Sequence, residues 1–300
     1  MLEAHLRVMG TTAHVLVVGC DRLVDTGLER LVDLEHRWSR FRPASEITQL
    51  NTSAGRPVVV SADTFELVER AIDGWRETAG LFDPTIGPAL CRAGYDRDFP
   101  LAVIHARSQE SLPAETAPGC AGIHLDPIVR SVTLPSGVVF DPGGIGKGLA
   151  ADIVSAELMA AGAHGALVNV GGDLRVRGEP PNGASWNVAI EDPMREPGEL
   201  FRVGLLDAAV ATSSRMQRRW QTPEGSMHHL IDPRSGQPAC TRIATATAVA
   251  RDAWWAEVVA KAVLIGNLNA SECARFEALV MTVDEDGLVL ADPGLLEAAA

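Results

Sequence analysis

The sequence predicts an α+β protein, in which mixed or antiparallel sheets pack against helices. Segments that alternate apolar and polar residues, as strands do, are interspersed with about four segments of helical periodicity. They do not follow the regular strand–helix alternation of a doubly wound parallel sheet. The length of 300 residues suffices for one large domain or for two closely packed ones.

Helical periodicity predicts four longer helices. In the first, Leu28, Leu31 and Val32 recur on one side of the helix. Ser61 or Asp63 is expected to cap the second, because a short polar side chain accepts hydrogen bonds from the first-turn N–H groups. The expected helices are 21–38, 64–78, 149–161 and 253–264, with a shorter capped turn after residue 45.

Alternating or short apolar runs bounded by turn residues predict the strands. They are expected at 6–18, 124–125, 131–140, 166–170, 174–177, 186–191, 201–206, 209–212, 227–231 and 244–250, with a closing hairpin of 278–284 and 287–291. Prolines make 81–90 irregular, and 92–120 is expected to be a variable loop excursion. Because no repeat or linker divides the chain, we expect a single domain over 1–300, with two closely packed lobes as the alternative.

Composition excludes several classes of protein. Lys and Arg number 26 against 39 Asp and Glu, and the net charge of −13 disfavours binding to nucleic acid or anionic lipid. The first residues do not resemble a signal peptide, and no apolar run has the roughly 18 residues that would span a membrane. We therefore expect a cytoplasmic protein without membrane insertion.

The cysteines fit neither a zinc site nor a disulfide framework, because they lie far apart and include no Cys-x-x-Cys pair. Cys20, Cys91, Cys120, Cys240 and Cys273 are expected to be reduced and mostly buried thiols.

Lysine is scarce. Only Lys147 and Lys261 occur among the 26 basic residues. Arginine preference or chance can explain this scarcity, but an ammonium differs from a guanidinium in size and donor geometry. Both lysines are therefore candidates for a specific role.

A glycine-rich turn, DPGGIGKG at 141–148, follows an expected strand and precedes an expected helix. Backbone N–H groups and the helix dipole attract phosphate at such a turn. The spacing matches neither the P-loop nor the dinucleotide fingerprint. The segment is either an anion-binding cradle or a tight turn without a ligand.

Four further segments have more than one interpretation each. Asn169, Gly171, Gly172 and Asp173 form either a hairpin turn or a close approach to a ligand. The segment at 81–85 is a helix-stop turn or an aromatic, carboxylate and hydroxyl cluster, and 212–214 is a sheet edge or a set of phosphate-binding hydroxyls. His229, followed by Asp232, is either a general base or phosphate donor, or a histidine that packs or faces solvent.

Taken in order, these segments resemble the ApbE family of FAD:protein FMN transferases. The matching pieces run from residue 9 to about 266, and they are Met9-Gly-Thr, FRPASEITQLN from 41, FDPTIGP from 82, DPGGIGKGLAAD from 141, NVGGD from 169 with Gly178 and Trp186, VATSS from 210, and HHLIDPRSG from 228. Each piece alone is weak, but seven in the family's order are not a coincidence.

The resemblance implies an α+β fold with a flavin-binding cleft and a reaction on FAD. A Thr or Ser hydroxyl of an acceptor flavoprotein attacks the FAD pyrophosphate, which gives phosphoester-linked FMN and releases AMP. Two alternatives stay open, a flavin-binding protein without transfer activity and an FAD pyrophosphatase that uses water.

The resemblance also implies roles for particular residues. His229, Asp232 and Lys147 are the expected catalytic residues. The expected FAD-binding residues are Met9, Phe41, Phe82, Asp83, Thr85, Gly143, Gly144, Lys147, Asn169, Gly171, Gly172, Asp173, Thr212, Ser213 and His229.

The family's metal site is matched incompletely. The resemblance implies Mg²⁺ held by a backbone carbonyl, here near Gly144, and by an Asp and a Thr four residues apart on a late helix. This chain has Glu257 and Lys261 at that spacing. We hypothesise that the Lys261 ammonium takes the place of the ion and that Glu257 holds it; the alternative is a solvated helix pair.

Overall fold

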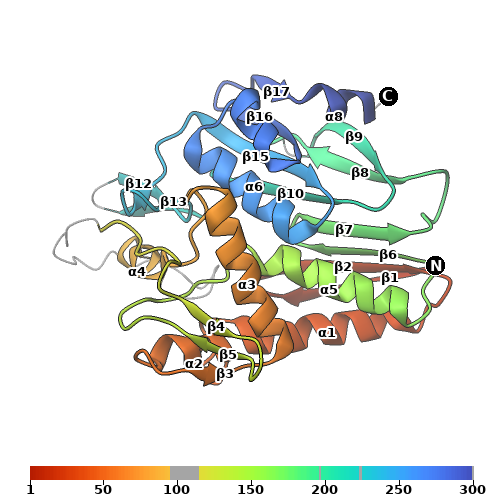
Figure 1. Cartoon of the computed structure of the whole chain (residues 1–300). Coiled ribbons are helices and arrows are strands. Elements are labelled where there is room, and N and C mark those ends of the chain that lie inside the picture. Colours follow the sequence, from red (N-terminus) through yellow and green to blue (C-terminus); the bar gives the residue numbers. More distant parts are fainter. Residues whose placement is uncertain (95–114, 196, 223–224, 299–300) are drawn as a thin grey trace. The chain divides into compact units, whose positions relative to one another are not determined.

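The computed structural model describes residues 1–94, 115–195, 197–222 and 225–298 (Figure 1). The chain forms two compact units. The first comprises Met1–Asp33, Lys147–Met216 and Thr241–Ala300, and the second comprises Leu34–Gly146 and Gln217–Cys240. Helices and antiparallel sheets occur together, which confirms the α+β class.

An antiparallel sheet organises the first unit. Its eight described strands lie in the order β1-β2-β6-β7-β10-β15-β16-β17. They are β1 (Leu2–Val8), β2 (Thr11–Val18), β6 (Gly165–Val170), β7 (Asp173–Gly178), β10 (Ala209–Ser214), β15 (Ile243–Ala250), β16 (Leu279–Asp284) and β17 (Val289–Ala291). The single strand expected at 6–18 is wrong, because Met9 and Gly10 turn the chain with φ of 53° and 68°. A bulky residue such as Met rarely adopts that conformation, so the sequence did not indicate the turn.

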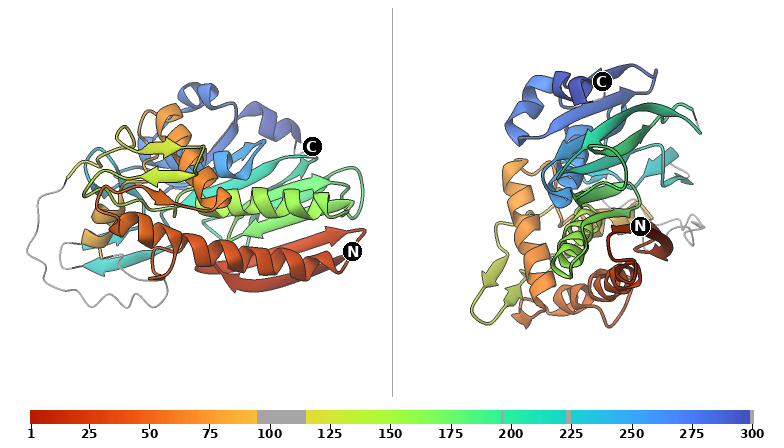
Figure 2. Two further views of the ribbon diagram at one scale, coloured as in Figure 1. Left: turned by 60° about the horizontal axis from the view of Figure 1, so that its bottom comes forward. Right: turned by 90° about the vertical axis from the view of Figure 1, so that its right-hand side faces the viewer.

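The two faces of this sheet are covered differently, as β7 shows. Successive side chains of a strand point to opposite faces. Leu174 and Val176 join an apolar cluster with the hairpin of β8 (Trp186–Glu191) and β9 (Glu199–Leu205). Asp173 and Arg175 therefore point to the other face, where they pair with Lys147 and Asp152 of α5. Figure 2 shows the ribbon from two further sides, coloured by residue number as in Figure 1.

Helices α5 (Gly146–Ala160) and α6 (Ala253–Gly266) begin very close together. A Cβ atom on Gly148 would lie 2.3 Å from the Ala253 carbonyl oxygen, so only glycine fits there. Helix α6 also packs along β10 and β15. The helices α7 (Ala270–Cys273) and α8 (Pro293–Ala298) and a 3₁₀ turn (Ala274–Phe276) complete this unit.

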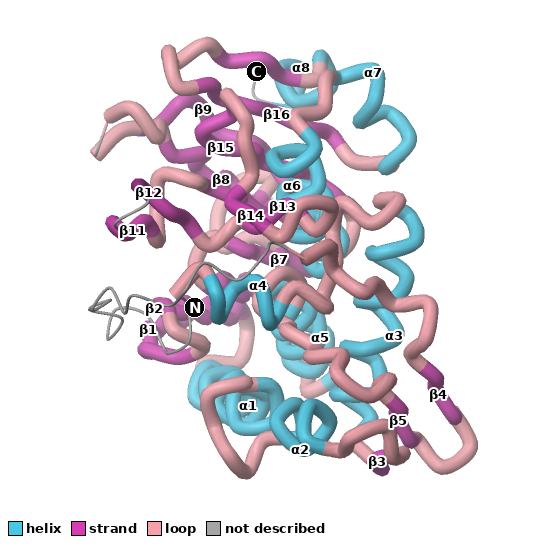
Figure 3. The backbone as a smooth tube through the Cα atoms, turned by 90° about the vertical axis from the view of Figure 1, so that its left-hand side faces the viewer, coloured by secondary structure: helices cyan, strands magenta, loops and turns pink. Residues whose placement is uncertain are grey.

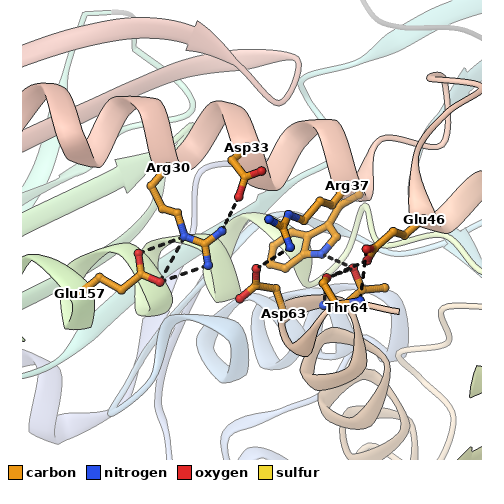
Figure 4. Close-up of polar contacts among 9 residues, drawn as sticks. Arg30, Asp33, Arg37, Glu46, Asp63, Thr64 and Glu157 are labelled. Atoms are coloured by element: carbon orange, nitrogen blue, oxygen red, sulfur yellow. Dashed lines mark hydrogen bonds and ion pairs between the residues drawn. The ribbon is translucent and has the colours of Figure 1, made fainter. Parts of the chain in front are cut away.

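Helix α1 (Leu23–Trp38) is joined to α5 by a charged contact. The Arg30 guanidinium donates to both Glu157 carboxylate oxygens, at 3.0 and 3.1 Å from Nε, and to Asp33 at 2.6 Å (Figure 4). These partners are partly exposed, so the contact contributes orientation more than stability.

Apart from the long helix α3 (Ala62–Glu77), the second unit contains short elements and much loop (Figure 3). The short elements are α2 (Glu46–Thr52), α4 (Gly87–Arg92), a sheet of β3 (Val58–Val59), β5 (Ser131–Thr133) and β4 (His124–Asp126), and the pairs β11 (Arg219–Thr222) with β12 (Gly225–His228) and β13 (Ile231–Asp232) with β14 (Gln237–Pro238). Ser45 and Ser61 accept from the backbone N–H three residues on, which confirms both caps.

Three expectations about this unit are wrong in part. The strand expected at 131–140 ends at Thr133, because Pro135 has no N–H to donate to a ladder. The segment at 81–90, expected to be irregular, contains α4, whose proline lies in the first turn where it is tolerated. The strand expected at 227–231 is interrupted between β12 and β13.

Other expectations have mixed outcomes. Of the loop expected at 92–120, residues 95–114 lie outside the described part of the chain. All five cysteines are free thiols, but only Cys120 and Cys273 are buried, so the expectation of mostly buried thiols is wrong. Among the described residues, none of the helices has the length and apolarity needed to cross a bilayer.

Candidate functional site

Three of the motif segments meet at one end of the large sheet in the first unit. Ala13 pairs with Val170, which places the Met9 turn beside the turn between β6 and β7. Val210 pairs with Leu174, so the residues after it on β10 extend toward the same end. The pairing register of the strands therefore brings Met9, the NVGGD turn and the VATSS segment to the same end of the sheet.

The NVGGD turn is built on two glycines that no other residue could replace easily. A Cβ atom on Gly171 would lie 2.4 Å from the Thr11 hydroxyl oxygen, and its φ is 65°. The Gly172 N–H donates to Asn169 Oδ1 at 2.8 Å, with φ of 98° at Gly172. The segment is thus a hairpin turn held close to β2.

Thr212 and Ser213 lie near this end on β10. The Thr212 hydroxyl shares a hydrogen bond of 2.9 Å with that of Thr247 on β15, while Ser213 is buried. The expected phosphate-binding hydroxyl of Thr212 therefore already has a protein partner.

A buried cluster of opposite charges lies under the start of α5. Lys147 Nζ donates to Asp173 Oδ2 and, at 2.8 Å, to Glu257 Oε1. The second Glu257 oxygen accepts from the Gly148 backbone N–H at 2.9 Å. The side chains of Asp173 and Glu257 are each 3% exposed and that of Lys147 is 19% exposed. We call Lys147, Asp173 and Glu257 the lysine–carboxylate cluster.

Electrostatics keep this lysine charged. Burial lowers the pKa of Lys147, but the carboxylates of Asp173 and Glu257 outweigh it and raise that pKa well above its ordinary value. Burial and the Glu257 carboxylate raise the pKa of Asp173, whereas Lys147 and Lys261 oppose that rise.

Lys261 lies one helical turn after Glu257 on α6, and its charge acts on Asp173. Because Glu257 is buried, the alternative of a solvated surface pair is wrong. The structure places the Lys147 ammonium on Glu257, whereas the sequence had suggested Lys261 for that position.

The cluster does not fit Mg²⁺. This ion requires several oxygen ligands in near-octahedral geometry. Both Glu257 oxygens and one Asp173 oxygen already accept hydrogen bonds. Within the described residues, no three His, Cys, Asp or Glu side chains are grouped as metal ligands. Glu257 as a metal ligand, expected with Gly144, is therefore not supported.

A second buried network, which the sequence did not single out, fixes the start of α6. Asp152 on α5 accepts from the N–H groups of Ala253 and Trp254 at 3.0 and 2.9 Å, and its Oδ1 lies 3.3 Å from Nε of Arg175. Burial raises the pKa of Asp152 to about 6. Arg175 is 1% exposed, and because arginine is rarely buried nothing in the sequence indicates that placement.

In the second unit, the glycine-rich turn uses several of its amides internally. Gly143 N–H donates to Asp141 Oδ1 at 2.7 Å, and the N–H groups of Ile145 and Gly146 donate to the Pro142 carbonyl. Asp141 also pairs with Arg40 at 3.0 Å. The segment is therefore a tightly bonded turn, with Gly144 at its centre.

The FDPTIGP segment forms a closed network. Asp83 Oδ1 accepts from the backbone N–H and the hydroxyl of Thr85 at 2.8 and 2.6 Å, and Thr85 Oγ1 accepts from Gly119 N–H at 3.0 Å. Burial raises the pKa of Asp83. Phe82 is 2% exposed, so its ring belongs to the core of this unit.

Phe41 and the histidine segment are more accessible. The Arg40 guanidinium lies 4.4 Å from the centroid of the half-buried Phe41 ring. His229 is half-buried between β12 and β13. Burial raises the pKa of Asp232, but hydrogen bonds from Arg234 outweigh it and hold that pKa below its ordinary value. Asp232 thus has Arg234 as a partner, which the sequence did not indicate.

Comparison with known proteins settles the family. The model of the ApbE family matches residues 9–279. The chain belongs to the ApbE family. ApbE relatives named FAD:protein FMN transferase include one from Vibrio cholerae, 26% identical over 294 residues that cover 93% of this chain and 86% of that protein. One from Treponema pallidum is 32% identical over 226 residues, which cover 68% of this chain and 60% of that protein.

Solved structures show the same ApbE fold. The crystal structure of the ApbE protein from Thermotoga maritima has a TM-score of 0.87 and 24% identity, and the match covers 100% of this chain and 99% of that one. The flavin transferase ApbE from Vibrio cholerae has a TM-score of 0.78 and 22% identity, covering 99% of each chain.

Proposed function

We propose that this chain is an FAD:protein FMN transferase, built from both units as one domain. The observation that carries the proposal is that its ApbE relatives of this name match it over most of its length. Further support comes from the sheet end where Met9, the NVGGD turn and the VATSS segment gather.

In this reaction an acceptor hydroxyl oxygen bonds to the FMN phosphorus and the pyrophosphate bond to AMP breaks. AMP leaves with the bridging oxygen, and the hydroxyl proton passes to a base. We assign His229 as that base, because an imidazole nitrogen can accept the proton of a hydroxyl, and Asp232 as a residue that positions its segment.

Other assignments follow the chemistry of the residues. Lys147 stays protonated and supplies positive charge for the diphosphate, where charge builds up in the transition state. Phe41 presents an aromatic ring to the isoalloxazine. Phe82, Asp83 and Thr85 support the nucleotide-binding segment from within the core.

The acceptor is proposed to be a cytoplasmic flavoprotein with a target threonine or serine. The acidic net charge disfavours nucleic acid and anionic membrane surfaces as partners.

The test combines the purified protein, FAD and an acceptor domain that carries a flavinylation threonine, with intact mass as the readout. We expect FMN to be added to the acceptor and AMP to be released, and a Thr→Val acceptor to remain unmodified. His229→Ala should lower the transfer rate by about 10²-fold or more. His124→Ala, a change at an exposed histidine of the same unit, is the matched control.

Two other results would contradict the proposal. AMP released at the same rate without an acceptor would indicate a pyrophosphatase. FAD bound with neither AMP nor modified acceptor would indicate a flavin-binding protein.

A further inference from the structure

The only two lysines of the sequence both act on the buried Asp173 carboxylate, and Lys147 also pairs with Glu257. Lys147 comes from α5, Asp173 from β7, and Glu257 and Lys261 from α6. We infer that the ammonium groups of Lys147 and Lys261 together form the cation of the flavin-phosphate site, so that FAD binding needs no divalent metal. This inference rests on the proposed function, because it takes the diphosphate of FAD as the ligand.

Charge balance is the first argument. When Lys261 is counted with the lysine–carboxylate cluster, two ammonium groups offset the two carboxylates, so no added ion is needed to balance their charge. A divalent cation would have to displace Lys147 from both carboxylates and break the 2.9 Å bond from Gly148 N–H to Glu257. It would then lie beside two positive charges in a poorly solvated region, where like charges repel strongly.

Donor geometry is the second argument. An ammonium carries three N–H donors. Within the described part of the chain, Lys147 donates to two carboxylates, which leaves a third donor for a phosphate oxygen. Its side chain is 19% exposed, so a ligand can reach it.

The choice of lysine is the third argument. The chain uses arginine for nearly every other positive charge. A guanidinium is a broad planar fork, whereas an ammonium is a compact point charge that comes closer to a small cation in shape. Lysine at both positions is therefore what a built-in cation requires.

The experiment measures FAD affinity and bound metal for the full chain. The protein is treated with EDTA, its metal content is determined by mass spectrometry, and FAD is titrated with and without added MgCl₂. We expect no stoichiometric metal and the same FAD affinity under both conditions. Stoichiometric metal, or a loss of affinity of about tenfold or more after EDTA, would overturn the inference.

Variants of Lys261 test whether its charge contributes to FAD affinity. Lys261→Met removes the charge but keeps most of the length, and we expect its FAD affinity without metal to fall about tenfold. Lys261→Thr should lose the same affinity and recover part of it with MgCl₂, because the hydroxyl adds an oxygen ligand. Arg251→Met, at an exposed position just before α6, is the control and should bind FAD normally. Wild-type affinity in Lys261→Met would overturn the inference.

Failure of the inference and failure of the proposed function are distinguishable. Metal-independent FAD binding that depends on Lys261, without transfer to an acceptor, supports the built-in cation and rejects the transferase. Transfer that requires added metal supports the transferase and rejects the built-in cation. A chain that binds no FAD under any condition rejects both.

Discussion

Glu257 and Lys147, which are 110 residues apart in the sequence, form a buried ion pair of 2.8 Å. The second Glu257 oxygen also accepts from the N–H of Gly148. One carboxylate of α6 therefore holds both a side chain and the backbone of the first turn of α5.

Glu257→Gln should destabilise the protein. The amide keeps the volume but removes the charge facing Lys147, and one of its two ends no longer accepts a hydrogen bond. Asp173 still partners Lys147, so we expect a loss of about 2 kcal/mol in the free energy of unfolding. Urea denaturation followed by circular dichroism measures it.

The matched control is Glu69→Gln at an exposed position of α3, where the free energy of unfolding should change by no more than about 0.5 kcal/mol. Equal stability of the two variants would show that the Glu257 charge is not buried.

The longer helices of the fold and two of their N-caps could be predicted from local sequence. Helical spacing and the Ser45 and Ser61 caps are short-range signals, and they located the four longer helices to within a few residues but not the short helices α4, α7 and α8. The turn at Met9 was missed, because positive φ at a methionine depends on its partners in the sheet and has no sequence signal of its own.

The lysine–carboxylate cluster was only partly predictable. Its three members were each singled out, but they lie in separate motifs on α5, β7 and α6. The fold brings them together, in part through the close approach of α5 to α6 at Gly148. Arg175 was missed, because its burial depends on Asp152 and Asp207, which lie on other parts of the fold.

Gly148→Ala should be poorly tolerated. The added methyl group would lie 2.3 Å from the Ala253 carbonyl oxygen, so the starts of α5 and α6 would have to separate. We expect a loss of about 3 kcal/mol in the free energy of unfolding, measured by urea denaturation.

Gly146→Ala, two residues earlier, provides the control. Its nearest neighbours would be 3.5 and 3.8 Å away, which are ordinary contacts, and alanine favours a helix more than glycine. The free energy of unfolding should be unchanged or slightly higher. A Gly148 variant as stable as this one would contradict the close packing of the two helices.

Thr85→Val should destabilise the second unit, while Thr85→Ser should do so much less. Valine lacks the hydroxyl that donates to Asp83 and accepts from the Gly119 N–H, which leaves two buried polar groups without that partner. We expect a loss of about 2 kcal/mol for valine and less than about 1 kcal/mol for serine, from thermal or urea denaturation. Equal losses would contradict this prediction, because they would show that the hydroxyl contributes no more to stability than the methyl group.

Asp152 should make stability depend on pH in the direction opposite to most carboxylates. Burial raises its pKa from 3.8 to about 6 in the folded protein, so the folded state binds more protons than the unfolded state between these values. The free energy of unfolding contributed by this group is therefore greatest below pH 3.8 and decreases as the pH rises through 6, by about 3 kcal/mol in total.

Asp152→Asn cannot titrate, so the difference in stability between wild type and this variant, measured in urea at a series of pH values, should decrease across that window. A difference that is constant with pH, or that increases, would show that Asp152 remains ionised in the folded state because its bonds to Ala253 and Trp254 outweigh its burial.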